Sequence, residues 1–200
     1  LIKDLKDARI IGDKDLEVSG ISYNSKYVEK GSLFVCIEGY KSDGHEYIGE
    51  AVKKGAVAVV IQRDAEVPDG ITVIKVKDSR KALALMSSSF FGYPSKSMKL
   101  IGVTGTSGKT TTTFIIKSIL DRAGYKTGLI GTICSIIDGK SVDSSRTTPE
   151  SYELQRMFAK MREAGEDYCV MEVSSHSLEL KRVEGCFFNT GVFTNLSRDH

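Results

Sequence analysis

The stretch GVTGTSGKTTT at residues 102–112 decides how the second half of the sequence is interpreted. Its first two residues belong to an apolar run at 100–103, which predicts a strand. Its last four residues begin the segment 109–124, which predicts a helix. A glycine-rich turn between a strand and a helix exposes unpaired backbone N–H groups at the positive end of the helix dipole. The stretch therefore predicts a loop that binds phosphate groups.

The residue types in this loop point to a nucleoside triphosphate. Gly105 and Gly108 let phosphate oxygens approach the backbone, and Lys109 can reach the outer phosphates. The hydroxyl of Thr110 is a candidate ligand for Mg²⁺. The loop is a variant of G-x-x-x-x-G-K-[ST], because Val103 stands where that pattern has its first glycine; the alternative is a turn that only joins a strand to a helix. The predicted ATP-binding residues are Gly105, Thr106, Ser107, Gly108, Lys109, Thr110 and Thr111.

Composition and charge give no reason to expect a nucleic-acid partner. The 200 residues are 40% hydrophobic and 27% charged, and the formal net charge of +2 is spread without a block of like charges. Residues 1–30 contain no continuous apolar segment, so no secretory signal or membrane insertion is predicted, and the cytoplasm is the expected location. Because the chain begins with Leu1 and ends at His200 directly after an apolar segment, we expect it to be part of a longer protein.

The four cysteines lie far apart in the sequence and form no C-x-x-C pair, which argues against a zinc site and against a disulfide framework. We interpret them as reduced thiols that fill the packed interior. These residues are Cys36, Cys134, Cys169 and Cys186.

Short apolar strands alternate with amphipathic helices, a pattern typical of an α/β fold with a mostly parallel sheet covered on both faces. Segment 93–99 interrupts the pattern with a proline and small polar residues, which predicts a boundary between two domains, 1–96 and 97–200. The predicted strands are 32–39, 56–62, 71–76, 100–103, 127–137 (one or two strands), 168–174 and 190–197. The predicted helices are 46–55, 78–92, 109–124 and 149–165, with a hairpin turn at 138–140.

Several residues carry helix signals. Asp78 is positioned to cap the helix at 78–92. Thr148 is positioned to cap the helix at 149–165, with Pro149 at its first position. The apolar residues along one side of the helix at 109–124 are Phe114, Ile115, Ile119 and Leu120.

A carboxylate is needed to share a Mg²⁺ ion with the loop, and Glu172 is the candidate. It ends the apolar run YCVME, and ligands of parallel sheets gather beyond the carboxyl ends of strands. The alternative is a strand-end glutamate that faces solvent.

Four separated blocks of this sequence resemble the Mur ligase family. They are VTGTSGKTTTT at 103–113, TTPES at 147–151, MEVSSHSLEL at 171–180 and FTNLSRDH at 193–200. The segment GSLFVCIEGYKSDGHEYIGEAVKKGAVAVV at 31–60 resembles the same family, so the resemblance covers nearly the whole chain. It implies a three-domain enzyme, of which this chain would hold an N-terminal α/β UDP-binding domain and the first part of a P-loop ATPase domain.

The resemblance implies ATP-dependent formation of an amide bond in peptidoglycan synthesis. In this family the γ-phosphate of ATP passes to a substrate carboxylate, an amine attacks the resulting acyl phosphate, and inorganic phosphate leaves. The match is closest to members that add the third residue of the stem peptide, so the implied substrates are UDP-MurNAc-L-Ala-D-Glu and an amino acid, with ATP and Mg²⁺ as cofactors. The expected enzyme is a monomer, and the 200 residues alone are expected to be inactive. The resemblance implies that residues of a later domain, outside this sequence, distinguish meso-diaminopimelate from L-lysine.

The resemblance also assigns roles to residues of the second half. Lys109, Glu172 and His200 match catalytic positions of the family. Thr110 and Glu172 would bind one Mg²⁺ ion, and Glu172 and His200 would bind a second. A carbamylated lysine of the family is expected beyond His200.

Contacts with the UDP-linked substrate are implied for both halves. Thr147 and Thr148 match positions that contact the muramoyl dipeptide. Ser174 and Arg182 match positions that meet its anionic groups, although Arg182 could instead lie in a solvated loop and Thr148 could only cap its helix. Residues interpreted as structural are Ser175 and His176.

The first half departs from the family at one point. Where the family has Asp-Ser-Arg near the uracil, this chain has Asn24, Ser25 and Lys26, which removes a negative charge. Ser25 and Tyr23 still match positions that contact the uridine. The residues that match the loop near the diphosphate are Tyr40, Lys41 and Ser42.

Two other functions fit parts of the pattern. One is a different amide ligase with the same ATPase core, such as a folylpolyglutamate synthase or a cyanophycin synthetase. The segment at 31–60 argues against that function, because those ligases lack such a block ahead of the loop. The other is a nucleotide-binding module that never transfers phosphate.

Overall fold

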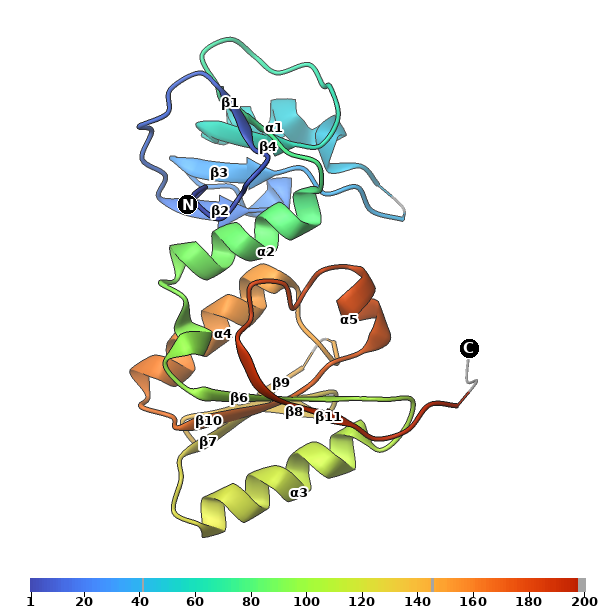
Figure 1. Cartoon of the computed structure of the whole chain (residues 1–200). Coiled ribbons are helices and arrows are strands. Elements are labelled where there is room, and N and C mark those ends of the chain that lie inside the picture. The colour runs from blue at the N-terminus through green and yellow to red at the C-terminus, as the bar shows by residue number, and fades with distance from the viewer. Residues whose placement is uncertain (41, 145, 198–200) are drawn as a thin grey trace. The chain divides into compact units, whose positions relative to one another are not determined.

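The computed structural model describes residues 1–40, 42–144 and 146–197 (Figure 1). The chain forms two compact units, Leu1–Met86 and Ser87–His200, each with its own β-sheet. Both sheets are mostly parallel, which confirms the predicted α/β class.

The two units divide inside α2 (Ser79–Phe90), ten residues before the domain boundary predicted from the sequence. The end of α2 and the residue after it make contacts within the second unit. The Ser88 hydroxyl donates to the carbonyl of Gly185 at 3.0 Å, and the ring of Phe91 lies 5.4 Å from that of Tyr152. The boundary at 96/97 stays a prediction about where one domain ends and the next begins.

The sheet of the first unit has the strand order β1-β5-β4-β3-β2. Strands β2 to β5 run parallel, and β1 pairs antiparallel with β5. The inner strands β3 and β4 are buried along their whole length, which explains why their apolar runs are continuous rather than alternating. The strands are β1 Arg9–Ile11, β2 Gly20–Ser22, β3 Ser32–Val35, β4 Ala58–Ile61 and β5 Thr72–Lys75.

Helical segments connect these strands. The predicted helix at 46–55 is a 3₁₀ turn, Gly44–Tyr47, followed by α1 (Ile48–Lys53), whose Ile48 and Ala51 pack into the core with Phe34. A second 3₁₀ turn, Ser25–Tyr27, follows β2. At the start of α2, Asp78 accepts the N–H of Lys81 at 2.9 Å, which confirms the predicted cap.

The sheet of the second unit has the strand order β11-β6-β10-β7-β8-β9. The first four strands in this order are parallel, and β8 and β9 add an antiparallel hairpin. Asp138 and Gly139 form the hairpin turn with φ of 52° and 69°, as the sequence predicts for 138–140. The strands are β6 Lys99–Thr104, β7 Thr127–Ile130, β8 Cys134–Ile137, β9 Lys140–Asp143, β10 Tyr168–Glu172 and β11 Phe188–Phe193.

Helices cover both faces of this sheet. Figure 1 shows α3 (Lys109–Arg122) on one face and α4 (Ser151–Glu163) and α5 (Ser175–Glu179) on the other. A 3₁₀ turn, Pro94–Lys96, precedes β6. Phe158 of α4 is fully buried against the sheet residues Leu100 and Met171. Among the described residues, no helix has both the length and the apolar character that crossing a membrane requires.

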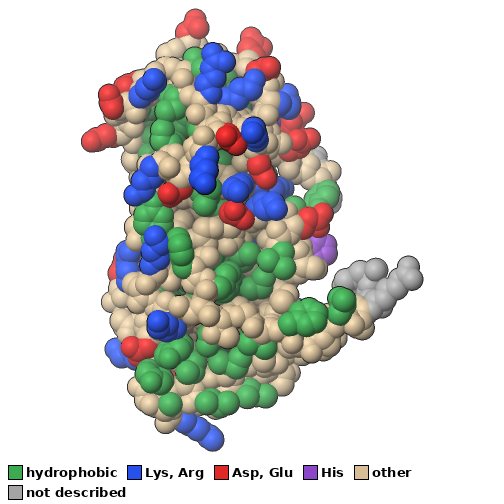
Figure 2. All heavy atoms as spheres, viewed as in Figure 1, with side chains coloured by type: hydrophobic (Ala, Val, Ile, Leu, Met, Phe, Trp, Pro, Cys, Tyr) green, Lys and Arg blue, Asp and Glu red, His purple; other side chains and the backbone are tan. Residues whose placement is uncertain are grey.

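The predicted apolar side of α3 is not the side that faces the sheet. Phe114, Ile115 and Ile119 are 37%, 54% and 61% exposed, whereas Thr113 is fully buried. The phosphate loop sets the rotation of this helix, because the side chain of Thr110 is directed to the sheet edge and Thr113 follows one turn later on the same face. In Figure 2, hydrophobic side chains accordingly reach the surface in the lower part of the view, where Figure 1 draws α3.

The predicted start of α4 is wrong. The helix begins at Ser151 with Glu150 as its N-cap, so Thr148 is not a cap and Pro149 is not the first helical residue. The reason is that the Thr148 hydroxyl is engaged elsewhere, with the backbone at the end of β10.

All four cysteines are free thiols, as the sequence predicts. Cys36 and Cys169 lie fully inside the two cores. Burial raises the pKa of Cys36 to about 12 and also raises that of Cys169, which keeps both thiols protonated and inert.

Candidate nucleotide and metal site

One edge of the second sheet gathers most of the candidate residues of this unit. Because β6, β7, β10 and β11 are parallel, their carboxyl ends meet at this edge. The phosphate loop follows β6, Thr132 follows β7, Glu172 ends β10, and Thr194 with Asn195 follows β11.

Gly105 and Gly108 of the loop are needed for different structural reasons. Gly105 has a φ of +135°, and a side chain there would collide with Thr194 and with the backbone of Asn195. Gly108 has a φ of +83° with open space around it. Gly105 is therefore needed for packing, whereas Gly108 provides a left-handed turn that leaves the backbone open to a ligand.

Backbone N–H groups remain available at the start of α3. The N–H groups of Thr106 and Ser107 are taken by Asn195, at 3.0 and 3.1 Å. Those of Gly108, Lys109, Thr110 and Thr111 have no hydrogen-bond partner within the part of the chain that the structure describes. Of the predicted binding residues, Thr106 and Ser107 therefore do not offer their N–H groups, and the four available in a row lie at the start of the helix, where its dipole is most positive.

The side chain of Lys109 folds back over the loop. Its ammonium donates to the carbonyls of Gly105 and Thr106 at 2.6 and 3.0 Å. A phosphate group in the cradle would compete with these carbonyls for the ammonium. Lys109 is thus already held over the loop, as a phosphate-binding lysine must be.

Glu172 lies beside Thr110, and the solvent-exposed alternative is wrong. The residue is 1% exposed. The Thr110 hydroxyl is 3.0 and 3.1 Å from its two carboxylate oxygens. Thr132 donates its N–H to one oxygen at 2.8 Å and its hydroxyl to the other at 3.1 Å.

These oxygen donors fit a Mg²⁺ ion. A hydroxyl and a buried carboxylate are hard ligands, and Mg²⁺ is commonly held by one or two protein groups together with water and phosphate. Within the described residues, no group of three or more His, Cys, Asp or Glu side chains could hold a metal, so a cation here would depend on the phosphates. The third predicted ligand, His200, lies outside the described residues.

The residues matched to the muramoyl dipeptide are tied to the same edge. The hydroxyls of Thr147 and Thr132 lie 3.0 Å apart, within hydrogen-bond distance. Thr148 donates to the carbonyl of Glu172 at 2.9 Å and accepts the N–H of Ser174 at 3.1 Å. Both residues thus extend the polar network around Glu172.

Arg182 is not in a solvated loop. Its guanidinium donates to the carbonyl of Thr148 at 3.2 Å and lies 3.4 Å from the carboxylate of Glu150, with 13% of the side chain exposed. Ser174 caps α5 by accepting the N–H of Ser177 at 3.2 Å. The structure therefore brings Thr147, Thr148, Ser174 and Arg182 together, while Ser175 and His176 are exposed on α5.

In the first unit, the residues matched to the uridine and those matched to the diphosphate follow neighbouring parallel strands. Tyr23 and Ser25 come after β2, and Tyr40 and Ser42 lie in the loop after β3. The Ser25 hydroxyl is buried and donates to Glu50 at 3.0 Å, whereas Tyr40 is 83% exposed. In this unit the acidic and basic side chains are mixed on the face that Figure 2 shows. Lys41 lies outside the described residues.

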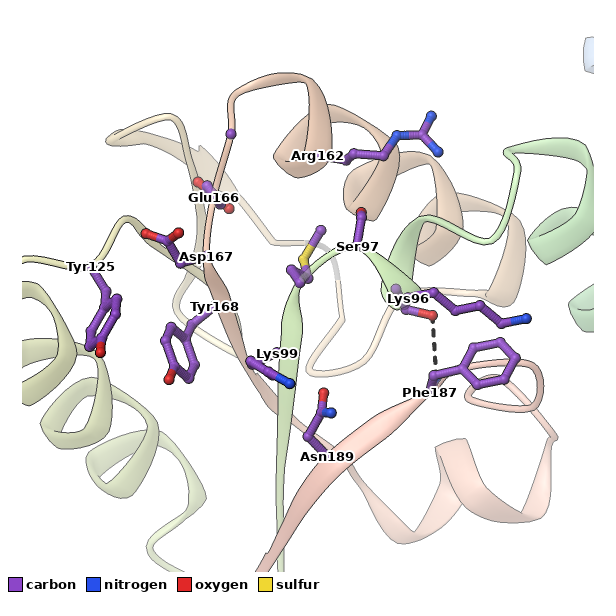
Figure 3. A pocket seen from close by; sticks show the side chains of 13 residues that line it. Lys96, Ser97, Lys99, Tyr125, Arg162, Glu166, Asp167, Tyr168, Phe187 and Asn189 are labelled. Carbon is purple, nitrogen blue, oxygen red and sulfur yellow. Dashed lines mark hydrogen bonds between the residues drawn. The ribbon is translucent and has the colours of Figure 1, made fainter.

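A cavity of about 890 Å³ lies at the opposite end of the second sheet, which sequence reasoning missed. Figure 3 shows side chains from the starts of β6 and β10 around it, and the N–H of Phe187 bonded to Ser95. Its Asp167 accepts the N–H of Lys126 at 2.9 Å, and its Arg162 donates to the carbonyl of Phe91 at 3.1 Å. These charged groups serve local backbone contacts rather than the phosphate loop.

Two site residues carried no role in the sequence analysis. Thr132 follows a strand end, but a threonine at such a position does not by itself indicate a binding residue. Asn195 lies in a quoted block, FTNLSRDH, whose position after an apolar run was the available signal.

A strand, a glycine-rich loop and a helix with a carboxylate beside the loop define a nucleotide-binding α/β protein. The chain matches two models of one family, described as "Mur ligase family, catalytic domain" over residues 17–91 and "Mur ligase middle domain" over residues 103–200. The chain belongs to the Mur ligase family.

Curated relatives agree with this family. The chain is 56% identical over 200 residues to the UDP-N-acetylmuramoyl-L-alanyl-D-glutamate–2,6-diaminopimelate ligase of Clostridium perfringens, covering 100% of the chain and 41% of that protein. It is 48% identical over 200 residues to the ligase of the same name from Alkaliphilus metalliredigens, covering 100% and 40%. The chain spans about two fifths of the length of these relatives.

Solved structures agree as well. A structure of UDP-N-acetylmuramoyl-L-alanyl-D-glutamate–2,6-diaminopimelate ligase superposes with a TM-score of 0.77 at 25% identity, covering 92% of this chain and 37% of that one. The MurF ligase from Thermotoga maritima in complex with ADP superposes with a TM-score of 0.61 at 26% identity, covering 92% and 39%.

Proposed function

We propose that the full-length protein to which this chain belongs is an ATP-dependent ligase that adds the third amino acid to UDP-MurNAc-L-Ala-D-Glu in peptidoglycan synthesis. The names of the curated relatives support this reaction, and they favour 2,6-diaminopimelate as the added amino acid. ATP, a UDP-linked sugar and an amino acid are intracellular metabolites, so the proposed reaction is cytoplasmic. The monomeric state expected from the sequence stays a prediction.

The convergence of Thr110 and Glu172 carries the proposal. A buried carboxylate without a basic partner is costly unless hydrogen bonds or a cation stabilise it, and the groups that bond Glu172 are a backbone N–H and hydroxyls. Such hydroxyls can turn their lone pairs toward a cation. The four available N–H groups, from Gly108 to Thr111, include that of Thr110 itself, so a phosphate would lie next to the cation.

The positively charged and N–H groups of this chain would bind the phosphates, and its oxygen ligands would bind the cation. The N–H groups from Gly108 to Thr111 would hold the phosphates in place, and Lys109 would neutralise the oxygens from which the γ-phosphate leaves. Thr110 and Glu172 would hold Mg²⁺, which when bound neutralises the phosphate oxygens. His200 is proposed as a further catalytic and metal-binding group.

The substrate carboxylate must lie in line with the γ-phosphate. We assign this positioning to Thr147, Thr148, Ser174 and Arg182, whose polar groups surround the end of β10. Uridine and diphosphate contacts are assigned to the first unit. The residues proposed for them are Tyr23, Ser25, Tyr40, Lys41 and Ser42.

The test measures phosphate release by the full-length protein. ATP and Mg²⁺ are mixed with UDP-MurNAc-L-Ala-D-Glu, with 2,6-diaminopimelate, with both, or with neither. We expect rapid release only when both are present, together with a product heavier than the UDP substrate by the mass of the amino acid less water. L-Lysine in place of 2,6-diaminopimelate tests the specificity.

The other outcomes separate the remaining functions. Phosphate release that does not depend on the UDP substrate would contradict the proposal. Release that needs another carboxylate acceptor would indicate a different amide ligase. ATP binding without release under every condition would indicate a nucleotide-binding module.

A further inference from the structure

The segment after β11 runs along the phosphate loop and bonds to it at successive residues. The N–H of Thr194 donates to the carbonyl of Thr104 at 2.9 Å, and the N–H of Thr106 donates to the carbonyl of Asn195 at 3.0 Å. Ser197 and the hydroxyl of Thr106 exchange bonds of 3.0 and 3.1 Å. This segment therefore supports the loop as a neighbouring strand would.

The side chain of Asn195 pairs with both backbone groups of one loop residue. Its Oδ1 accepts the N–H of Ser107 at 3.1 Å, and its Nδ2 donates to the carbonyl of Ser107 at 3.1 Å. The hydroxyl of Thr194 donates to the same carbonyl at 2.7 Å. Two donors thus hold the Ser107 carbonyl, and this carbonyl belongs to the peptide group that joins Ser107 to Gly108.

The orientation of this peptide group decides where the next N–H points. A peptide group is planar, and in its trans form the C=O and the N–H point in opposite directions. With the Ser107 carbonyl directed at Asn195, the N–H of Gly108 is directed away from Asn195. The N–H of Gly108 is available, whereas those of Thr106 and Ser107 just before it are taken, and the space around Gly108 is open.

A glycine at this point makes the peptide group easy to rotate. Gly108 has a φ of +83°, and glycine adopts both signs of φ at similar cost. A rotated peptide group would direct a carbonyl, instead of an N–H, toward an incoming phosphate. The loop therefore needs a group that holds the peptide in one orientation.

We propose that Asn195, assisted by Thr194, is the positioning residue that fixes the Ser107–Gly108 peptide group and thereby presents the Gly108 N–H to the phosphates of the nucleotide. This inference rests on the proposed nucleotide site. Asn195 contacts the loop and not the reacting atoms, so its loss acts on nucleotide affinity through the backbone of Gly108.

The experiment compares two Asn→Ala variants of the full-length protein. Asn195→Ala removes the bonds to Ser107. Asn189→Ala is the matched control, because Asn189 lies in β11, ahead of the segment that holds Asn195. Its Oδ1 also accepts a backbone N–H, that of Leu100, at 2.9 Å, at the other end of the sheet. ADP binding is measured by calorimetry, thermal unfolding is followed for each variant, and KM and kcat are measured with ATP and with the UDP substrate.

We expect Asn195→Ala to raise the Kd of ADP and the KM of ATP about tenfold, since one charge-assisted hydrogen bond is worth roughly that factor. The KM of the UDP substrate should stay within about twofold. Asn189→Ala should leave the Kd of ADP within about twofold even where it lowers the unfolding temperature. Thr194→Val, which keeps the shape and loses one donor, should raise the Kd by about threefold, and it serves as the second variant if Asn195→Ala fails to fold.

Unchanged ADP binding in Asn195→Ala, or equal weakening in Asn195→Ala and Asn189→Ala, would overturn this role for Asn195. The ADP measurement does not require ligase activity. If the wild-type protein binds ADP but releases no phosphate with the UDP substrate, the proposed reaction fails while the comparison of the two variants still decides the role of Asn195.

Discussion

Two buried glutamates, Glu166 just before β10 and Glu172 as its last residue, lie in opposite surroundings. Glu172 at the carboxyl end is 1% exposed, and its carboxylate is surrounded by three donors: the Thr110 hydroxyl, the Thr132 hydroxyl and the Thr132 N–H. Glu166 at the amino end is 7% exposed; one oxygen accepts the N–H of Asp138 at 2.8 Å, and the other is buried with no partner among the described residues.

The difference shows how neighbours, rather than burial, decide what a carboxylate can do. Around Glu172 the partners are mostly hydroxyls, which can rearrange when a cation arrives. Glu166 lies against Gly128 and Met161, and burial raises its pKa above the usual glutamate value, which favours the neutral acid. One end of the strand is therefore suited to ion binding and the other to packing.

The largest expected effect compares two lysines of the same strand–loop unit. Lys109→Ala in the full-length protein should lower ATP turnover by at least about 10²-fold, because it removes a charge that stabilises the transferring phosphate. Lys99→Ala, at the exposed amino end of β6, should stay within about twofold of the wild type. The turnover of both variants is measured as steady-state phosphate release. Equal losses of turnover would contradict the assignment of the phosphate site to the carboxyl end of β6.

The two glutamates can be compared directly. Glu172→Gln should lower kcat by about 10- to 100-fold and raise the Mg²⁺ concentration needed for half-maximal activity, because an amide is a weaker ligand than a carboxylate. Glu166→Gln should leave the Mg²⁺ requirement unchanged. The measurement is a Mg²⁺ titration of phosphate release, and a shifted requirement in Glu166→Gln would contradict the assignment.

Two glycines test the packing of the loop. Gly105→Ala should lower the free energy of unfolding by about 1–3 kcal/mol, because φ is +135° and the new methyl group meets Thr194. That loss corresponds to about 2–4 °C per kcal/mol in unfolding temperature. Gly191→Ala in β11 meets nothing and has no left-handed φ, so it should be neutral or slightly stabilising in the same thermal scan.

The smallest effect concerns pH. Because the pKa of Glu166 is raised in the folded protein, its contribution to stability is fully present below the usual value of 4.5 and is lost as pH rises through the folded-state pKa. Relative to the wild type, Glu166→Gln should therefore gain unfolding temperature between pH 4.5 and pH 7, by a few degrees at most. A difference that is constant with pH would show that the pKa of Glu166 is the same in the folded and unfolded states, and would contradict the raised pKa.

Much of this site could be predicted because its residues follow strand ends. The loop at 102–112 and Glu172 each carry a local pattern, and the parallel sheet brings such ends together. The three-residue strands β1 and β2 were missed, since so short a run has no readable periodicity. The hydroxyl of Thr148 was misassigned, because its bond to Glu172 joins residues 24 apart in the sequence.

The exposed side of α3 could not be predicted for a related reason. An apolar stripe predicts the buried face only when packing alone sets the rotation of a helix. In this protein the loop sets it, so Thr113 takes the position against the sheet and Ile115 faces out. Asn195 illustrates the same limit, because its partner Ser107 is 88 residues earlier in the chain.

The register of β10 against β6, in which Glu172 stands opposite Val103, has a consequence for sequence change in this protein. Deleting one residue within β10 would move every later side chain by about 3.3 Å and turn it to the other face of the sheet. The carboxylate would then point away from Thr110 even though the strand still paired. We therefore expect length variation among natural variants to accumulate in the turn at 138–140 and to be absent between Tyr168 and Glu172.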